Sequence, residues 1–273
     1  MAEFLAIHLS DAALLGCVLR RVAGKISLGA SERAAGVGFH QSDDVLLRKR
    51  PLGGQAALPE KLAEGVESEA ALICSGAVSS ARSFNEQTTL PFRFKNWLFA
   101  TAGQPEALRP ARSALLKGLP DYLRRSVKGD SATEGLFFTF LSRLRDAGRL
   151  DDHDLDAEVA AKALAAAVGE TERAFEQMGQ PLPGIAVVVT NGRVMAAVRR
   201  GHPLRIRVVD GLIPCQRCEI GPGANELDPK VKSHRILKAA MVLSAAEPVE
   251  EFREVAEREV IAIPRTLTDV RSL

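Results

Sequence analysis

The chain has 273 residues, of which 46% are hydrophobic and 26% are charged, the composition of an ordinary globular protein that can bury a sizeable core. Its 36 basic residues nearly balance its 34 acidic ones and are spread along the whole chain, which argues against a nucleic-acid-binding tail. The chain starts without a basic leader, no apolar run reaches the roughly 20 residues of a membrane span, and four cysteines suit a reducing compartment. We therefore expect a cytoplasmic protein that binds neither nucleic acid nor membranes.

The first half of the chain alternates short apolar runs with turn residues. Its period-2 patterns predict strands at Phe4–Leu9, Gly36–Gln41, Val45–Arg48, Ala70–Val78 and Asn96–Thr101, and the segment 11–24 predicts an amphipathic helix. Within these elements we interpret His8 as a hydrogen-bonded, half-buried residue, and Cys17 and Cys74 as small core residues.

In the second half of the chain, the spacing of apolar residues first predicts helices and then strands. Segment 131–148 places Leu136, Phe140 and Leu144 on one helical face, and segment 155–179 shows the same period, so two stacked helices are predicted. Asn191-Gly192 then predicts a hairpin between two β-rich runs, and further strands are predicted at 204–210, 235–246 and 259–264. This order of elements favours a layered α+β domain that spans residues 1–273.

Several stretches, taken in order, resemble the class II glutamine amidotransferases of the N-terminal-nucleophile (Ntn) hydrolase superfamily. They are "GVGFHQSDDVLLRKRP", "TTLPFRFKNWLFATAG", "VTNGRVMAAVRRG" and "LSAAEPVEEFREVAEREVIAIP". The resemblance implies a four-layer αββα sandwich, in which two antiparallel sheets pack face to face between helix layers. We expect the helices of 131–180 in one outer layer, and the N-terminal helix with segment 111–127 in the other.

The positions that carry chemistry in that family are occupied differently here. The resemblance places the cysteine nucleophile, which becomes N-terminal once the initiator methionine is removed, at Ala2, and the two oxyanion donors at Ala102 and Gly103. It places the arginine that clamps the glutamine carboxylate at Ala77, and the aspartate that holds the substrate α-amine at Ala132. Of these five vestigial positions, only Gly103 retains a family residue, so the resemblance implies a degenerate active site.

Two functional hypotheses follow from this pattern. The first is a catalytically inactive amidotransferase-like pseudoenzyme that serves as a protein-binding, scaffold or regulatory subunit, with a protein partner or a second copy of itself and without glutamine binding or a cofactor. The alternative is a glutamine amidotransferase or amidohydrolase whose cysteine has been replaced in this chain or whose substrate is not glutamine. Loss at several independent positions favours the first.

A Cys-x-x-Cys motif lies in a variable segment at about 211–234. Cys215 and Cys218, with His234, have the spacing of metal ligands, and a structural zinc site would need a fourth ligand, for which His202 is a candidate. A redox pair or a conditional disulfide, and plain loop thiols, are the alternatives.

Overall fold

The structure is a computed structural model and describes residues 2–29, 34–42, 44–76 and 84–273. Its strands form two antiparallel sheets. The seven-stranded sheet has the order β11-β9-β10-β1-β4-β2-β3 and contains β1 (Glu3–Leu9), β2 (Ala34–Gln41), β3 (Asp44–Pro51), β4 (Ala70–Ser75), β9 (Arg205–Asp210), β10 (Lys238–Ser244) and β11 (Arg253–Glu254). The six-stranded sheet has the order β13-β12-β8-β7-β6-β5 and contains β5 (Phe92–Phe94), β6 (Trp97–Gly103), β7 (Ile185–Thr190), β8 (Met195–Arg200), β12 (Val260–Ile263) and β13 (Arg271–Ser272).

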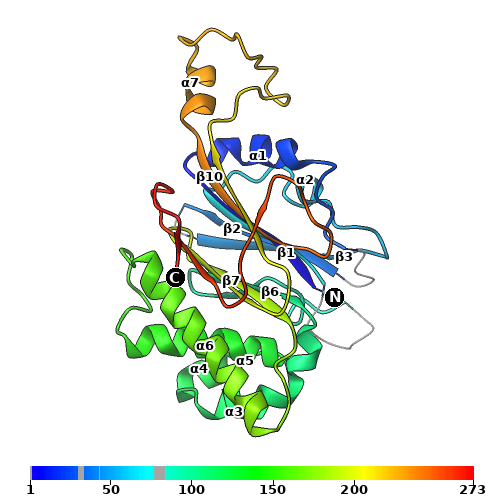
Figure 1. Cartoon of the computed structure of the whole chain (residues 1–273), viewed down its shortest axis with the longest axis vertical. Coiled ribbons are helices and arrows are strands. Elements are labelled where there is room, and N and C mark those ends of the chain that lie inside the picture. Colours follow the sequence, from blue (N-terminus) through cyan, green and yellow to red (C-terminus); the bar gives the residue numbers. More distant parts are fainter. Residues whose placement is uncertain (1, 30–33, 43, 77–83) are drawn as a thin grey trace.

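Helices cover the outer face of each sheet, which completes the predicted αββα sandwich (Figure 1). The seven-stranded sheet is covered by α1 (Leu15–Val22), with the 3-10 turn η1 (Ala12–Leu14) before it, and by α2 (Pro59–Leu62). The six-stranded sheet is covered by α5 (Ala132–Asp146) and α6 (Ala157–Gln177), with η2 (Pro105–Ala111), α3 (Arg112–Lys117) and α4 (Asp121–Ser126) alongside. Within the described residues, no helix is both long and apolar enough to cross a membrane.

The predicted helix pair forms because each member has a polar start and an apolar face. Ser131 caps α5 by accepting a hydrogen bond from the backbone N–H of Thr133 at 3.1 Å, and Asp156 caps α6 in the same way. The apolar face of α5 then meets the aromatic residues of β6, with ring centroids 5.0 Å apart for Phe99 and Phe137.

The structure differs from our expectation in which helices form each outer layer. Segment 111–127 was expected beside the N-terminal helix, but α3 and α4 lie in the layer of α5 and α6. The reason is that Leu115, Leu119 and Leu123 bury their side chains in the same apolar cluster as Leu136 of α5. The remaining outer layer is made by α1 and α2.

The two sheets approach each other closely where the G-V-G motif lies. A Cβ on Gly36 would lie 2.2 Å from the carbonyl oxygen of Leu90, and one on Gly38 would lie 2.8 Å from a methyl of Leu98. Only glycine leaves room for this contact, so the motif is explained by packing between the sheets.

Between β9 and β10 the chain leaves the sandwich over residues 211–237. The two strands pair directly where the excursion begins and ends, with Asp210 opposite Lys238. The excursion contains α7 (Pro229–Ile236) and protrudes above α1 in Figure 1. The start of the strand predicted at 235–246 is therefore corrected, because residues 235 and 236 end α7 and the strand begins at Lys238.

Candidate functional site

Ala2 lies at the head of β1, at the point where the two sheets are joined by main-chain hydrogen bonds. Its N–H donates to the carbonyl oxygen of Gly103 at 3.1 Å, and the Gly103 N–H donates to the Ala2 carbonyl oxygen at 3.0 Å. Ala2 is only 1% exposed, and its side chain belongs with Phe4 and Ala6 to the apolar cluster that includes the space between the sheets. The side chain at this position is a methyl group, and the Gly103 N–H already has an acceptor.

Ala102 precedes Gly103 in β6 and is fully buried. Because side chains alternate along a strand, Ala102 faces the same side as Leu98, which contacts Gly38 of the opposite sheet. The structure thus brings Ala2, Ala102 and Gly103 together at one end of the space between the sheets. Ala77 lies outside the described residues.

Ala132 is the first residue of α5 and is 2% exposed. Two residues later, the carboxylate of Glu134 accepts hydrogen bonds from the backbone N–H groups of Lys128 and Gly129, at 2.9 and 2.7 Å. Glu134 therefore fixes the loop before α5, and the neighbouring Ala132 carries only a methyl group.

Two residues beside this site were not identified from the sequence. The buried Glu3 carboxylate accepts hydrogen bonds from the backbone N–H of Gly29 and, at 2.9 Å, from that of Ala246, and so ties the head of β1 to the closing segment. The imidazole of His202 packs over Gly103, where a Cβ would lie 3.3 Å from its Cγ. Burial lowers the pKa of His202. Glu3 directly follows Ala2, but no motif assigns it a role, and the sequence suggested His202 only as a metal ligand.

A cavity of about 250 Å3 opens between β3, β5 and the start of α5. It is lined by Leu47, Lys49, Glu86, Gln87, Phe92, Arg93, Ser126, Lys128, Glu134, Phe137 and Phe138. The Lys49 ammonium donates to the Glu86 carbonyl oxygen at 2.8 Å, and burial lowers the pKa of Lys49 to about 8. Lys49 is on β3, three strands from β1, so its backbone lies roughly 14 Å from that of β1.

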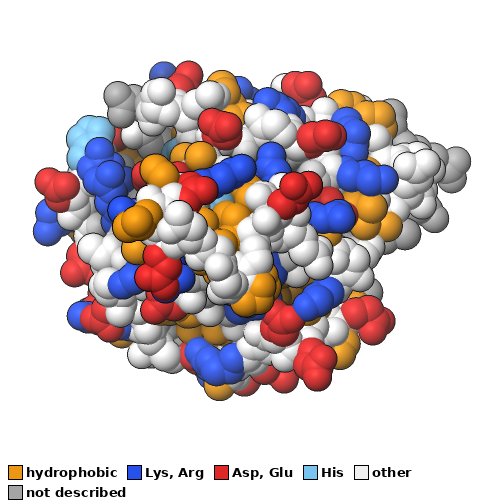
Figure 2. Space-filling view, turned by 90° about the horizontal axis from the view of Figure 1, so that it is seen from above, with side chains coloured by type: hydrophobic (Ala, Val, Ile, Leu, Met, Phe, Trp, Pro, Cys, Tyr) orange, Lys and Arg blue, Asp and Glu red, His pale blue; other side chains and the backbone are white. Residues whose placement is uncertain are grey.

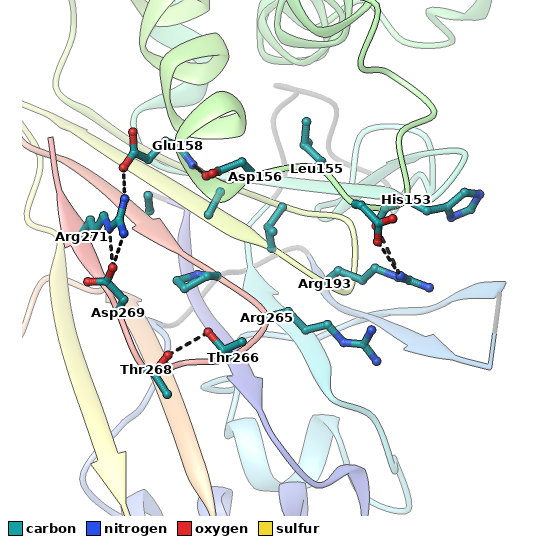
Figure 3. A pocket seen from close by; sticks show the side chains of 15 residues that line it. His153, Leu155, Asp156, Glu158, Arg193, Arg265, Thr266, Thr268, Asp269 and Arg271 are labelled. Atoms are coloured by element: carbon teal, nitrogen blue, oxygen red, sulfur yellow. Dashed lines mark hydrogen bonds and ion pairs between the residues drawn. The ribbon is translucent and has the colours of Figure 1, made fainter.

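A larger cavity of about 480 Å3 lies at the opposite end of β6 and β7, near the Asn191-Gly192 turn (Figure 3). Its charged side chains largely neutralise one another: Arg271 pairs with Asp269 and Glu158, and Arg193 lies 3.8 Å from Asp154. This cavity is separate from the position of Ala2.

The predicted metal-ligand residues come together, with a different fourth partner. Cys215, Cys218 and His234 lie in the excursion, and their ligand atoms, together with the sulfur of Cys17 on α1, all lie within 4.8 Å of one another. Cys17 is buried, as predicted, but its sulfur also lies 3.5 Å from that of Cys218. His202, the candidate fourth ligand, lies instead against Gly103.

Two face-to-face antiparallel sheets between helix layers, with the head of a central strand at the site, define the Ntn-hydrolase class of fold. Solved structures of similar fold include a glutamine aminotransferase class-II domain protein from Silicibacter pomeroyi, at 14% identity and a TM-score of 0.59, covering 99% of this chain and 98% of that one. A predicted glutamine amidotransferase from Pseudomonas aeruginosa is similar at 16% identity and a TM-score of 0.54, with 98% of both chains covered. The glutamine phosphoribosylpyrophosphate amidotransferase of B. subtilis matches at 15% identity and a TM-score of 0.51, over 99% of this chain and 48% of that one.

No protein-family model matches the sequence, and no curated protein matches it. The chain has the fold of the class II glutamine amidotransferases, which confirms the resemblance predicted from its motifs.

Proposed function

We propose that this protein is a catalytically inactive protein of the glutamine amidotransferase fold, which acts by binding a protein partner. The reciprocal pair of backbone hydrogen bonds between Ala2 and Gly103 carries this proposal. The nucleophile position has no sulfur, and the one retained oxyanion donor is already engaged.

Hydrolysis of an amide needs a nucleophile and donors aimed at the oxygen on which negative charge develops. Ala2 offers a methyl group in place of a thiol. Ala102 offers no side-chain amide, and the Gly103 N–H donates to the Ala2 carbonyl. Loss of one such donor typically reduces kcat by about 100-fold to 1000-fold, and both donors are affected here.

Glutamine binding also lacks its anchors. The resemblance places the carboxylate that would hold the substrate α-amine at Ala132 and the arginine that would clamp the substrate carboxylate at Ala77, so neither position carries a charged side chain. Leaving a buried polar group without a partner costs about 1–3 kcal/mol, so a site without these two anchors disfavours a zwitterionic amino acid. We therefore expect glutamine not to bind.

The decisive experiment restores the nucleophile. Ammonia release from L-glutamine is measured for the natural chain and for Ala2→Cys, with and without Ala102→Asn, after mass spectrometry has confirmed removal of the initiator methionine. We expect all three proteins to match a no-protein blank, because the substrate anchors are missing as well. Glutamine turnover by the natural chain would refute the proposal; turnover by Ala2→Cys alone would show that the pocket still accepts glutamine.

One observation favours an enzymatic alternative that acts on a substrate other than glutamine. Lys49 borders the 250 Å3 cavity, and its pKa of about 8 leaves part of its amine neutral at physiological pH. If this alternative holds, the natural chain hydrolyses some member of a panel of amides and esters, and Lys49→Met abolishes that activity while Lys61→Met, in α2, does not. The same rate in Lys49→Met and the natural chain would show that the Lys49 amine takes no part in the reaction.

A further inference from the structure

Three sulfurs and one imidazole from distant parts of the chain meet between α1 and the excursion 211–237. Cys17 comes from α1, Cys215 and Cys218 come from the start of the excursion, and His234 comes from α7. We propose that these four residues bind one Zn²⁺ ion in a tetrahedral Cys3His site that fastens the excursion to α1.

The distances suit this coordination. With Zn–S bonds of about 2.3 Å and a Zn–N bond of about 2.0 Å, the ligand atoms of a tetrahedral site are roughly 3.5–3.8 Å apart. All four ligand atoms already lie within 4.8 Å of one another, and the sulfurs of Cys17 and Cys218 are 3.5 Å apart. Small side-chain rotations therefore complete the site without movement of the backbone.

The orientation of His234 is fixed as in many metal sites. The side chain is fully buried, and its Nδ1 lies 2.7 Å from the Lys230 carbonyl oxygen, to which it donates its proton. This hydrogen bond leaves the lone pair on Nε2, which is buried and has no hydrogen-bond partner among the described residues. A buried nitrogen of this kind needs a partner, and a cation beside three sulfurs supplies one.

The Cys-x-x-Cys turn is built to point both sulfurs to one side. The Cys215 N–H donates to the Ile220 carbonyl at 2.9 Å, and the Ile220 N–H donates to the Cys215 carbonyl at 3.0 Å. Between them, Glu219 adopts a positive φ of 57°, a conformation that costs energy for a residue other than glycine. Such strain persists where the surrounding structure requires the turn.

The excursion has too small an apolar core to hold its shape by packing alone. Its buried apolar side chains include Leu212, Ile220 and Val231, while Leu227 and Ile236 are 76% and 73% exposed. Short segments with so little buried area are commonly stabilised by a metal or by disulfides. A single disulfide would use two sulfurs and leave the third thiol and the His234 lone pair unused, whereas zinc uses all four groups.

The test uses the untagged full-length chain, purified under reducing conditions from zinc-supplemented cells. We expect about one zinc per chain by elemental analysis. Replacement by Co²⁺ should give the thiolate charge-transfer and d–d absorption bands of a tetrahedral sulfur site. Cys218→Ser and His234→Ala should each lower the zinc content at least tenfold, while Cys74→Ala, which removes a buried thiol elsewhere, should retain it.

A measurement on the natural chain does not depend on how the variants fold. A mercurial reagent that titrates thiols should release zinc in proportion to the thiols modified, as followed with a chromogenic zinc indicator. Less than about a tenth of an equivalent of zinc together with no cobalt spectrum would overturn the proposal. A disulfide in the non-reduced natural protein that persists in the presence of zinc, or iron–sulfur absorption in place of zinc, would overturn it too.

Discussion

His8 is buried in surroundings that do not stabilise a protonated imidazole. The residue lies in β1, is 1% exposed, and its Nδ1 has no hydrogen-bond partner among the described residues. Burial, together with the nearby charges of His40 and Arg265, lowers its pKa to about 4. The expectation of a half-buried residue is therefore wrong, because the side chain is fully buried. Apolar neighbours in a strand pattern do not reveal that both faces of β1 are covered, one by α1 and the other by the second sheet.

This histidine makes the fold sensitive to acid. In the unfolded chain His8 binds a proton near pH 6.5, and in the folded chain only near pH 4. The unfolded state thus holds more protons between these values, so this contribution to stability is complete above pH 6.5 and is lost as the pH falls towards 4. We expect a loss of roughly 3 kcal/mol over that window.

Urea unfolding at a series of pH values measures the loss. We expect His8→Leu to flatten the pH dependence, and His153→Gln, at an exposed histidine, to leave it unchanged. An equal loss in His8→Leu and the natural chain would assign the acid sensitivity to other groups.

The sequence indicates which residues meet at the head of β1 but not what surrounds them. Ala2, Ala102 and Gly103 lie together because they occupy strands whose pairing the fold dictates, and their assigned roles stay a prediction. Cys17 was not recognised as a neighbour of Cys218, because some 200 residues separate them and helical periodicity shows only that Cys17 is buried.

At the scale of elements, the spacing between the sheets depends on Gly36. Alanine at this position would place its Cβ 2.2 Å from the backbone oxygen of Leu90, which cannot rotate away as a side chain can. We expect Gly36→Ala to lower the free energy of unfolding by about 1–3 kcal/mol, the usual cost of overpacking.

Chemical denaturation measures this cost against a matched control. The control is Gly118→Ala, just after the end of α3, where the added Cβ would lie 3.9 Å from the nearest atom. This substitution should change the free energy of unfolding by less than about 0.5 kcal/mol. Equal effects of the two substitutions would show that the contact between the sheets is not tight in solution.

Long periodic elements were predicted well, and short ones were not. The apolar period of α5 and α6 and the turn at Asn191-Gly192 specify structure locally. The secondary structure of residues 131–200 therefore agrees closely with the prediction from the sequence. In contrast, α3 and α4 are too short to indicate which layer they join, and α7 is held by a few long-range contacts. Their positions depend on tertiary packing that no local pattern records.

At the scale of the whole molecule, one sheet edge suits the proposed partner. β3 ends the seven-stranded sheet with only β2 beside it among the described strands, and Leu46 and Leu47 are 39% and 37% exposed. The basic residues Arg48 and Arg50 follow, so an extended acidic segment fits this edge best. Elsewhere, the face above α1 and α7 carries basic and acidic side chains interspersed, without a field of one sign (Figure 2).

Photo-crosslinking in the native cell tests this edge. A photoreactive amino acid at Leu46 should give a discrete adduct with another protein, whereas the same group at Tyr122, 47% exposed on α4, should not. Identical adduct patterns at the two positions would place the partner elsewhere.

The packing of α1 against the excursion has a consequence for the order of assembly during synthesis. The apolar cluster that covers the outer face of the seven-stranded sheet joins residues such as Leu15 and Val18 to Leu212 and Val231. The ribosome makes α1 early, but this cluster lacks its last members until most of the chain has emerged. β1, at the centre of its sheet, must likewise wait for β10. The N-terminal elements therefore remain incomplete until β10 has left the ribosome, so this layer is expected to fold only after β10 has emerged.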